Sequence, residues 1–142
     1  MQIARRASER CLPNAPNDAA LAIILASRGL IRSLNEEFLH HSGDTDVIAF
    51  EYAASGGPAD FAADDELLWG EIYVCLPVAE RAAQEHRTSV SFEVILYIIH
   101  GLLHLAGFDD HTDSDRRRMR RREMQIMSVV EAEFGAADVF QQ

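Results

Sequence analysis

The sequence predicts a small α+β domain, with a mixed sheet of about four strands packed against helices and a central buried helix that carries histidines. Short apolar runs typical of strands alternate with helical segments, which are too short for a full doubly wound fold. Residues 92–105 are apolar almost throughout. This segment is too short to cross a bilayer and too apolar for a surface helix, so we expect it at the centre of the core. A chain of 142 residues predicts one domain over residues 1–142.

Three strands and two helices are predicted before that segment. Apolar or β-branched runs place strands at 21–26, 47–52 and 68–76, and residues 1–3 are a candidate edge strand. Ile31, Leu34 and Phe38 form the stripe of an amphipathic helix. Pro77 suits the first turn of a further helix that ends near His86.

A last helix is expected from Thr112, its predicted cap, to about Phe134. Its packed side is predicted to consist of Met119, Glu123, Ile126, Met127 and Val130. Six of the seven residues in 116–122 are arginines, and the chain contains no lysine. The arginines predict either a solvated helix face or a surface that contacts phosphate, and the sequence favours neither.

The central helix carries the residues with clear chemistry. Ser91 is its expected N-cap, and Gly107 its expected stop. His100 and His104 are four residues apart, which places two imidazoles on one helical face at a spacing suited to a single metal ion. Two core histidines bonded to carbonyls are the alternative, but this would bury several polar nitrogens that all need partners.

The third ligand is expected just beyond Gly107, where the chain can turn back toward the same ion. Asp109, Asp110 and His111 are the candidates, and spacing alone does not choose among them. Imidazoles with a nearby carboxylate suit Zn²⁺ best, one ion per chain, with nickel, copper and iron(II) as alternatives.

Composition limits the class of protein. Cys11 and Cys75 form no Cys-x-x-Cys motif, which predicts a reducing, cytoplasmic compartment and a core position for Cys75. No signal peptide, membrane span or membrane partner is expected. The formal charge of −10 would repel a polyanion at long range, so any RNA binding must use a local basic surface.

Three blocks of sequence resemble the YbeY family of bacterial endoribonucleases that mature rRNA. Residues 100–111, His-Gly-Leu-Leu-His-Leu-Ala-Gly-Phe-Asp-Asp-His, are similar to the family's His-Gly-x-Leu-His-Leu-x-Gly-Tyr-Asp-His. Residues 45–50, Thr-Asp-Val-Ile-Ala-Phe, resemble Thr-Asp-Val-Leu-Ser-Phe, and residues 70–75, Gly-Glu-Ile-Tyr-Val-Cys, resemble Gly-Asp-Ile-x-Ile-Ser. The blocks occur in the family's order, and the resemblance covers about residues 21–123.

Two departures from the family pattern concern the site. The extra aspartate moves the last histidine one residue further from His104, so Asp110 occupies the usual ligand register. We predict His100, His104 and His111 as the metal ligands, because one added loop residue is easily absorbed, with Asp110 as the alternative third ligand. Leu39 stands where the family has an arginine thought to assist catalysis.

The resemblance implies a single-strand-specific endoribonuclease that acts in small-subunit rRNA maturation and ribosome quality control, with the assembling ribosome as partner. Three protein ligands would leave the fourth position of a zinc ion for water, which suits hydrolysis. Asp109 and Asp110 are the candidate catalytic residues, to orient a ligand or move a proton. A peptidase is disfavoured because Gly101 replaces the glutamate of His-Glu-x-x-His. Another zinc hydrolase (peptidase or esterase) and a non-catalytic assembly factor with a structural metal are the alternatives.

Overall fold

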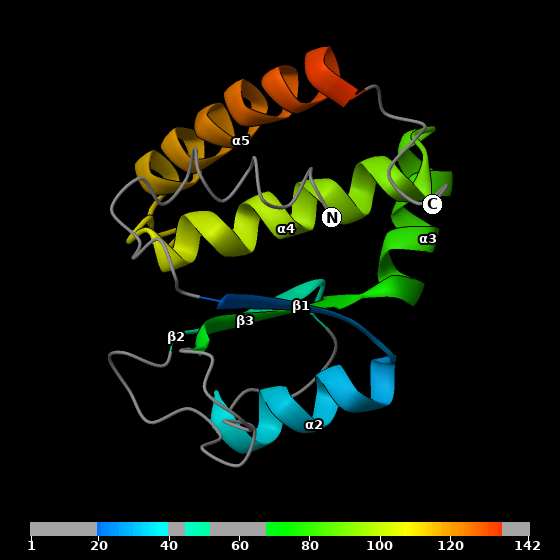
Figure 1. The fold of residues 1–142 in the computed structure, drawn as a ribbon, viewed down its shortest axis with the longest axis vertical. Coiled ribbons are helices and arrows are strands. Elements are labelled where there is room, and N and C mark those ends of the chain that lie inside the picture. Colours follow the sequence, from blue (N-terminus) through cyan, green and yellow to red (C-terminus); the bar gives the residue numbers. More distant parts are fainter. Residues whose placement is uncertain (1–19, 40–44, 52–67, 135–142) are drawn as a thin grey trace.

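A computed structural model describes residues 20–39, 45–51 and 68–134 of the chain (Figure 1). The elements in chain order are β1 (Ala20–Ala26), α2 (Arg28–Phe38), β2 (Val47–Glu51), β3 (Leu68–Cys75), α3 (Leu76–His86), α4 (Val90–Leu105) and α5 (Asp113–Phe134). These elements confirm the predicted α+β class. The candidate edge strand at 1–3 lies outside the described residues, and the assignment of 1–142 to one domain stays a prediction.

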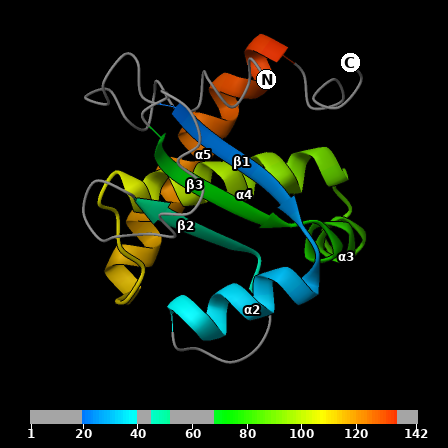
Figure 2. The same cartoon turned by 60° about the horizontal axis from the view of Figure 1, so that its bottom comes forward.

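The sheet is mixed, with the order β1-β3-β2 (Figure 2). β3 is its central strand and pairs in parallel with β1 and antiparallel with β2. The register places Ile72 of β3 beside Ile23 of β1 and Ala49 of β2. The three strands predicted from apolar runs are therefore confirmed within the described part of the chain.

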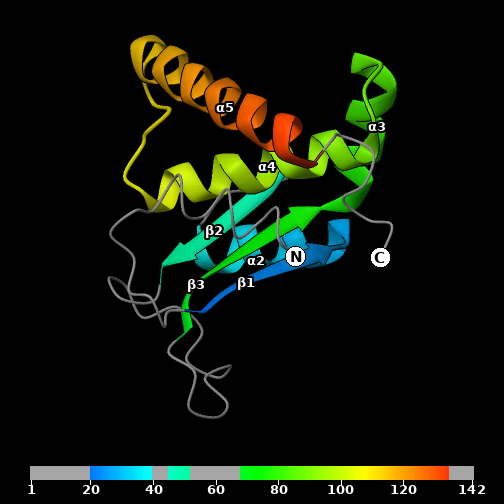
Figure 3. The ribbon, with the colours of Figure 1, turned by 45° about the horizontal axis from the view of Figure 1, so that its top comes forward.

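Helices cover both faces of the sheet. α4 lies over one face with α5 along its outer side, α2 covers the other face, and α3 stands at one end (Figure 1; Figure 3). Successive residues of β3 alternate between two apolar clusters, as the period of two in a strand requires. Ile72 and Val74 join the cluster around α4, while Tyr73 and Cys75 join the cluster around α2. The core position predicted for Cys75 is confirmed, because its side chain is fully buried.

α4 is the central buried helix that the sequence predicts. Nine of its residues are buried, from Glu93 to Leu103. The predicted cap was wrong by two residues: the Ser89 hydroxyl accepts the Phe92 N–H at 3.0 Å, and Ser91 lies inside the helix. The predicted stop is confirmed, because Gly107 adopts φ +97° just after the helix end.

The outer helices also match their predicted patterns. The Thr112 hydroxyl accepts the Asp115 N–H at 3.0 Å at the start of α5, as expected of its cap. All five residues predicted for the packed side of α5 are buried. α3 begins at Leu76, before Pro77 and earlier than predicted, and β3 accordingly ends at Cys75.

Across the described ranges, no single helix is both long and apolar enough to cross a membrane. α3 and α4 meet that criterion only when they are taken together across a bend of 118°.

Candidate metal centre

The candidate site lies where the C-terminal half of α4 passes closest to the sheet. Gly101, between the two histidines, permits this approach. A β-carbon there would lie 3.0 Å from Ile72 Cγ2 and 3.3 Å from Val47 Cγ2. Since real β-carbons rarely come so close, a larger residue would require Ile72 and Val47 to move by a few tenths of an ångström.

His100 and His104 are each held by a partner on the ring nitrogen that does not face the site. His104 Nδ1 lies 3.1 Å from the carbonyl oxygen of Phe108. His100 Nδ1 lies 2.5 Å from Glu123 Oε1, which α5 brings to α4. A carbonyl or carboxylate oxygen accepts a hydrogen bond from a ring N–H, so both Nδ1 atoms carry hydrogen and both Nε2 atoms of the neutral rings present lone pairs.

The two Nε2 atoms lie only 3.1 Å apart. Two lone pairs at that distance repel, unless a proton or a cation lies between them. Fixing the tautomer through the distal nitrogen is also the arrangement found around metal-ligating histidines. The two Nε2 atoms are therefore placed so that one cation could bind to both rings.

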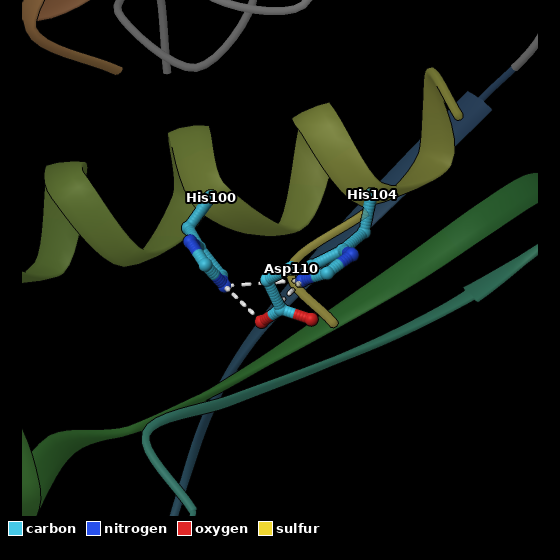
Figure 4. A group of neighbouring side chains, drawn as sticks. All are labelled: His100, His104 and Asp110. Carbon is cyan, nitrogen blue, oxygen red and sulfur yellow. Dashed lines mark hydrogen bonds and ion pairs between the residues drawn. The ribbon is translucent and has the colours of Figure 1, made fainter. Parts of the chain in front are cut away.

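The Asp110 carboxylate completes this group (Figure 4). Its Oδ2 atom lies 3.6 Å from His104 Nε2 and 4.0 Å from His100 Nε2. Bonds of about 2.0–2.1 Å at tetrahedral angles place neighbouring ligand atoms about 3.3 Å apart. The separations of 3.1 and 3.6 Å are close to this value and the separation of 4.0 Å is longer, so these three side chains are candidates to hold one metal ion.

A proton competes for the same position. Burial lowers the pKa of His100, but the hydrogen bond and charge of Glu123, together with the charges of Asp46 and Asp110, outweigh burial. The pKa of His100 is therefore raised above its ordinary value of 6.5. The carboxylates around this ring favour positive charge at the site.

His111, the third ligand preferred from the sequence, lies apart from this group. Its side chain is 83% exposed, and its Nε2 atom pairs with Asp109 Oδ1 at 3.2 Å. A second group of potential donors consists of Asp109, Asp110 and His111. Asp110 belongs to both groups, so the structure brings it, rather than His111, to the two helix histidines.

Asp109 supports the backbone of this loop. Its Oδ1 atom accepts the Asp110 N–H at 2.8 Å as well as facing His111. Leu39, which stands at the family's arginine position, caps α2 and is 41% exposed. His40 and His41, which follow Leu39 in the sequence, lie outside the described residues.

The pattern of the last helix predicts Glu123 only on the packed side of α5 and gives no indication of its contact with His100. The one signal was a carboxylate among otherwise apolar buried positions. A buried carboxylate needs a hydrogen-bond partner, and a histidine of the neighbouring helix is one residue that could supply it. The Phe108 carbonyl was not predictable, because any residue there offers the same group.

The fold and the site define a class: a small α+β domain in which two histidines and a carboxylate converge on one candidate metal position. The family model described as Endoribonuclease YbeY matches residues 2–131. The chain belongs to the YbeY family, which confirms the resemblance found in the sequence.

Relatives named Endoribonuclease YbeY align with most of the chain. The protein from Salinibacter ruber is 36% identical over 110 residues, which cover 78% of this chain and 69% of the relative. That from Chlorobium luteolum is 40% identical over 103 residues, covering 72% and 68%. The solution structure of TM1509 from Thermotoga maritima is similar with a TM-score of 0.58 and 28% identity, and the match covers 94% of this chain and 82% of that one.

Proposed function

We propose that this protein is a zinc-dependent endoribonuclease that cleaves single-stranded RNA during maturation of small-subunit rRNA and in ribosome quality control. Family membership supports RNA cleavage, since the relatives are named endoribonucleases. The observation that carries the metal dependence is the pair of Nε2 atoms 3.1 Å apart, each the free nitrogen of an anchored ring. The assembling ribosome in the cytoplasm is the proposed partner.

His100, His104 and Asp110 would hold one Zn²⁺ per chain, with His111 as the alternative to Asp110. A zinc ion with three protein ligands supplies a Lewis acid and a source of hydroxide near neutral pH. Glu123 and the Phe108 carbonyl keep the two rings in the tautomer that binds metal. Asp109 orients the loop through the Asp110 N–H, so its proposed role is to position Asp110.

The test combines metal analysis with cleavage of a labelled single-stranded RNA. We expect the wild type to bind one zinc ion and to cleave the RNA. His100→Ala, His104→Ala and Asp110→Ala should each lose both properties. Loss of a direct ligand should exceed the roughly 10- to 100-fold cost in affinity that is typical of losing an outer partner.

The same measurements separate the third-ligand alternatives. His111→Ala should retain zinc if Asp110 is the ligand, and it should lose zinc if His111 replaces it. Variants purified in parallel control for contaminating ribonucleases, because a contaminant would give the same cleavage in all samples. Zinc-loaded wild type that leaves single-stranded RNA intact would contradict the proposed activity.

A non-catalytic assembly factor with a structural metal is the second candidate, and it is favoured by Leu39. This side chain offers no charge at the position where the family has an arginine. Association with immature small subunits, combined with no RNA cleavage by the zinc-loaded wild type, would support this candidate.

A further inference from the structure

Arg116 of α5 holds the backbone of the loop that carries the third donor. Residues 106–112 connect α4 to α5 without forming a helix or a strand. Nη1 of Arg116 donates to the carbonyl oxygens of Asp110 at 3.1 Å and His111 at 3.3 Å. The other terminal nitrogen of the guanidinium pairs with Asp113.

These contacts fix the direction of two neighbouring side chains. The Asp110 N–H is bound by Asp109, and its carbonyl is bound by Arg116, so both peptide planes that flank the Asp110 α-carbon are anchored. The planes on both sides of His111 are likewise held by Arg116 through the carbonyls of residues 110 and 111. With peptide planes fixed, the direction of each β-carbon is fixed as well.

We propose that Arg116 is a positioning residue that sets the register of this loop, so that Asp110 faces His100 and His104 while His111 faces solvent. This role rests on the proposed metal site, because it makes Arg116 the residue that determines which side chain becomes the third ligand. Without Arg116, the backbone dihedral angles of residues 110 and 111 would be free to change, and either side chain could then approach the histidines.

The sign of the effect separates this role from simple electrostatics. A guanidinium near a cation site repels the cation, so by charge alone its removal would strengthen metal binding. If Arg116 instead anchors the ligand loop, its removal weakens metal binding. Arg120 is the matched control: it lies one turn further along α5, is also exposed, and has no contact with the loop among the described residues.

The experiment measures zinc affinity by competition with a chelator for the wild type, Arg116→Ala and Arg120→Ala. We expect Arg116→Ala to bind zinc about 10- to 100-fold more weakly, the usual cost of losing a partner beyond the ligands. Arg120→Ala should bind as tightly as the wild type or slightly more tightly. Far-ultraviolet circular dichroism checks that both variants fold, which we expect because both side chains are exposed. Equal affinity of the two variants would overturn the role of Arg116.

A second pair of variants tests the choice of ligand directly. In the wild-type background, His111→Ala should leave zinc affinity and the absorption of the cobalt(II) form unchanged. In the Arg116→Ala background, His111→Ala should weaken binding further, because His111 can then reach the ion. If His111→Ala alone weakens binding as much as Asp110→Ala does, the proposed register is wrong. Failure of the wild type to bind zinc or cobalt would overturn the metal site itself, and not the arginine's role alone.

Discussion

At the scale of single residues, the site depends on which nitrogen of each imidazole carries the proton. The spacing of His100 and His104 can be read from the sequence, but the tautomer of each ring depends on its hydrogen-bond partner. The partner of His104 is Phe108, four positions away, and the partner of His100 is Glu123, 23 positions away. Glu123 is a buried acidic residue, and its 2.5 Å contact with His100 joins α5 to α4. This carboxylate therefore couples the packing of α5 to the chemistry of His100.

Replacement of Glu123 should weaken zinc binding in a graded manner. Glu123→Gln keeps an oxygen that can accept the hydrogen bond from His100 Nδ1 but removes the charge, so we expect zinc affinity to fall by about tenfold. Glu123→Ala removes both the hydrogen-bond acceptor and the charge, so zinc affinity should fall by about 100-fold. Competition with a chelator gives both affinities. Met124→Ala, on the exposed side of the same helix, is the control, and equal affinity of all three variants would contradict this role of Glu123.

Residue types and spacing indicate the candidate donors, but not the arrangement of the last three. Asp109, Asp110 and His111 are consecutive, and the backbone dihedral angles of the loop decide which side chain faces α4. The contacts that hold this backbone come from Arg116, one of six arginines that look alike in the sequence. A local pattern cannot distinguish an arginine that curls back onto a loop from one that extends into solvent.

At the scale of elements, Gly101 links the sheet to the histidine pair. Its α-carbon faces the buried Ile72 side chain, so two histidines on one helical face can stand next to the strands. Glycine in a helix costs about 1 kcal/mol relative to alanine. The close approach of α4 to β2 and β3 is the physical reason for glycine at this position.

A branched side chain at position 101 should disturb both the fold and the site. Gly101→Val inserts atoms where even a β-carbon would lie 3.0 Å from Ile72, and overpacking of this kind costs about 1–3 kcal/mol. Urea unfolding measures the loss of free energy, and zinc competition measures the shift of the histidines. The double variant Gly101→Val/Ile72→Ala should lose less stability than the sum of the two single losses, because Ile72→Ala removes the contacting atoms. Purely additive effects in the double variant would rule out this contact as the cause.

Element types followed from the sequence, whereas the first residues of α3 and α4 did not. Periodicity gives the buried helix and the strands, because burial acts on many residues at once. Ser89 and Ser91 offer the same hydroxyl at the same helix start, and only the backbone geometry selects Ser89 as the cap. Pro77 likewise suits either of the first two helical positions, which accounts for the early start of α3.

The two serines allow a direct check of this boundary. Ser89→Ala removes the acceptor for the Phe92 N–H and should cost about 1 kcal/mol of stability. Ser91→Ala should change stability by less than about 0.5 kcal/mol, because that position lies within the helix and alanine favours helices. Urea unfolding of both variants gives the comparison. The reverse order of the two losses would place the cap at Ser91, as the sequence alone predicted.

At the scale of the whole molecule, charge is distributed unevenly along the chain. Residues 113–122 carry six arginines and two aspartates, a local net charge of +4, whereas the whole chain carries −10. Arg117 and Arg121 lie one turn apart and are both exposed, while the opposite side of α5 contributes Met119 and Ile126 to the core. α5 therefore presents a basic outer surface, and its first arginine, Arg116, lies four residues after the cap, Thr112.

This surface should contribute to RNA affinity if the proposed function is correct. Each phosphate contact to a single strand changes the slope of log affinity against log salt by about 0.7, so removal of two contacts in Arg117→Ala/Arg121→Ala should flatten the slope by about 1.4. Arg28→Ala/Arg81→Ala removes the same charge from exposed positions on α2 and α3, and it is the control. Fluorescence anisotropy with a labelled single-stranded RNA at several salt concentrations measures both slopes. Equal slopes for the two double variants would mean that the arginines of α5 act only through net charge and do not contact phosphate.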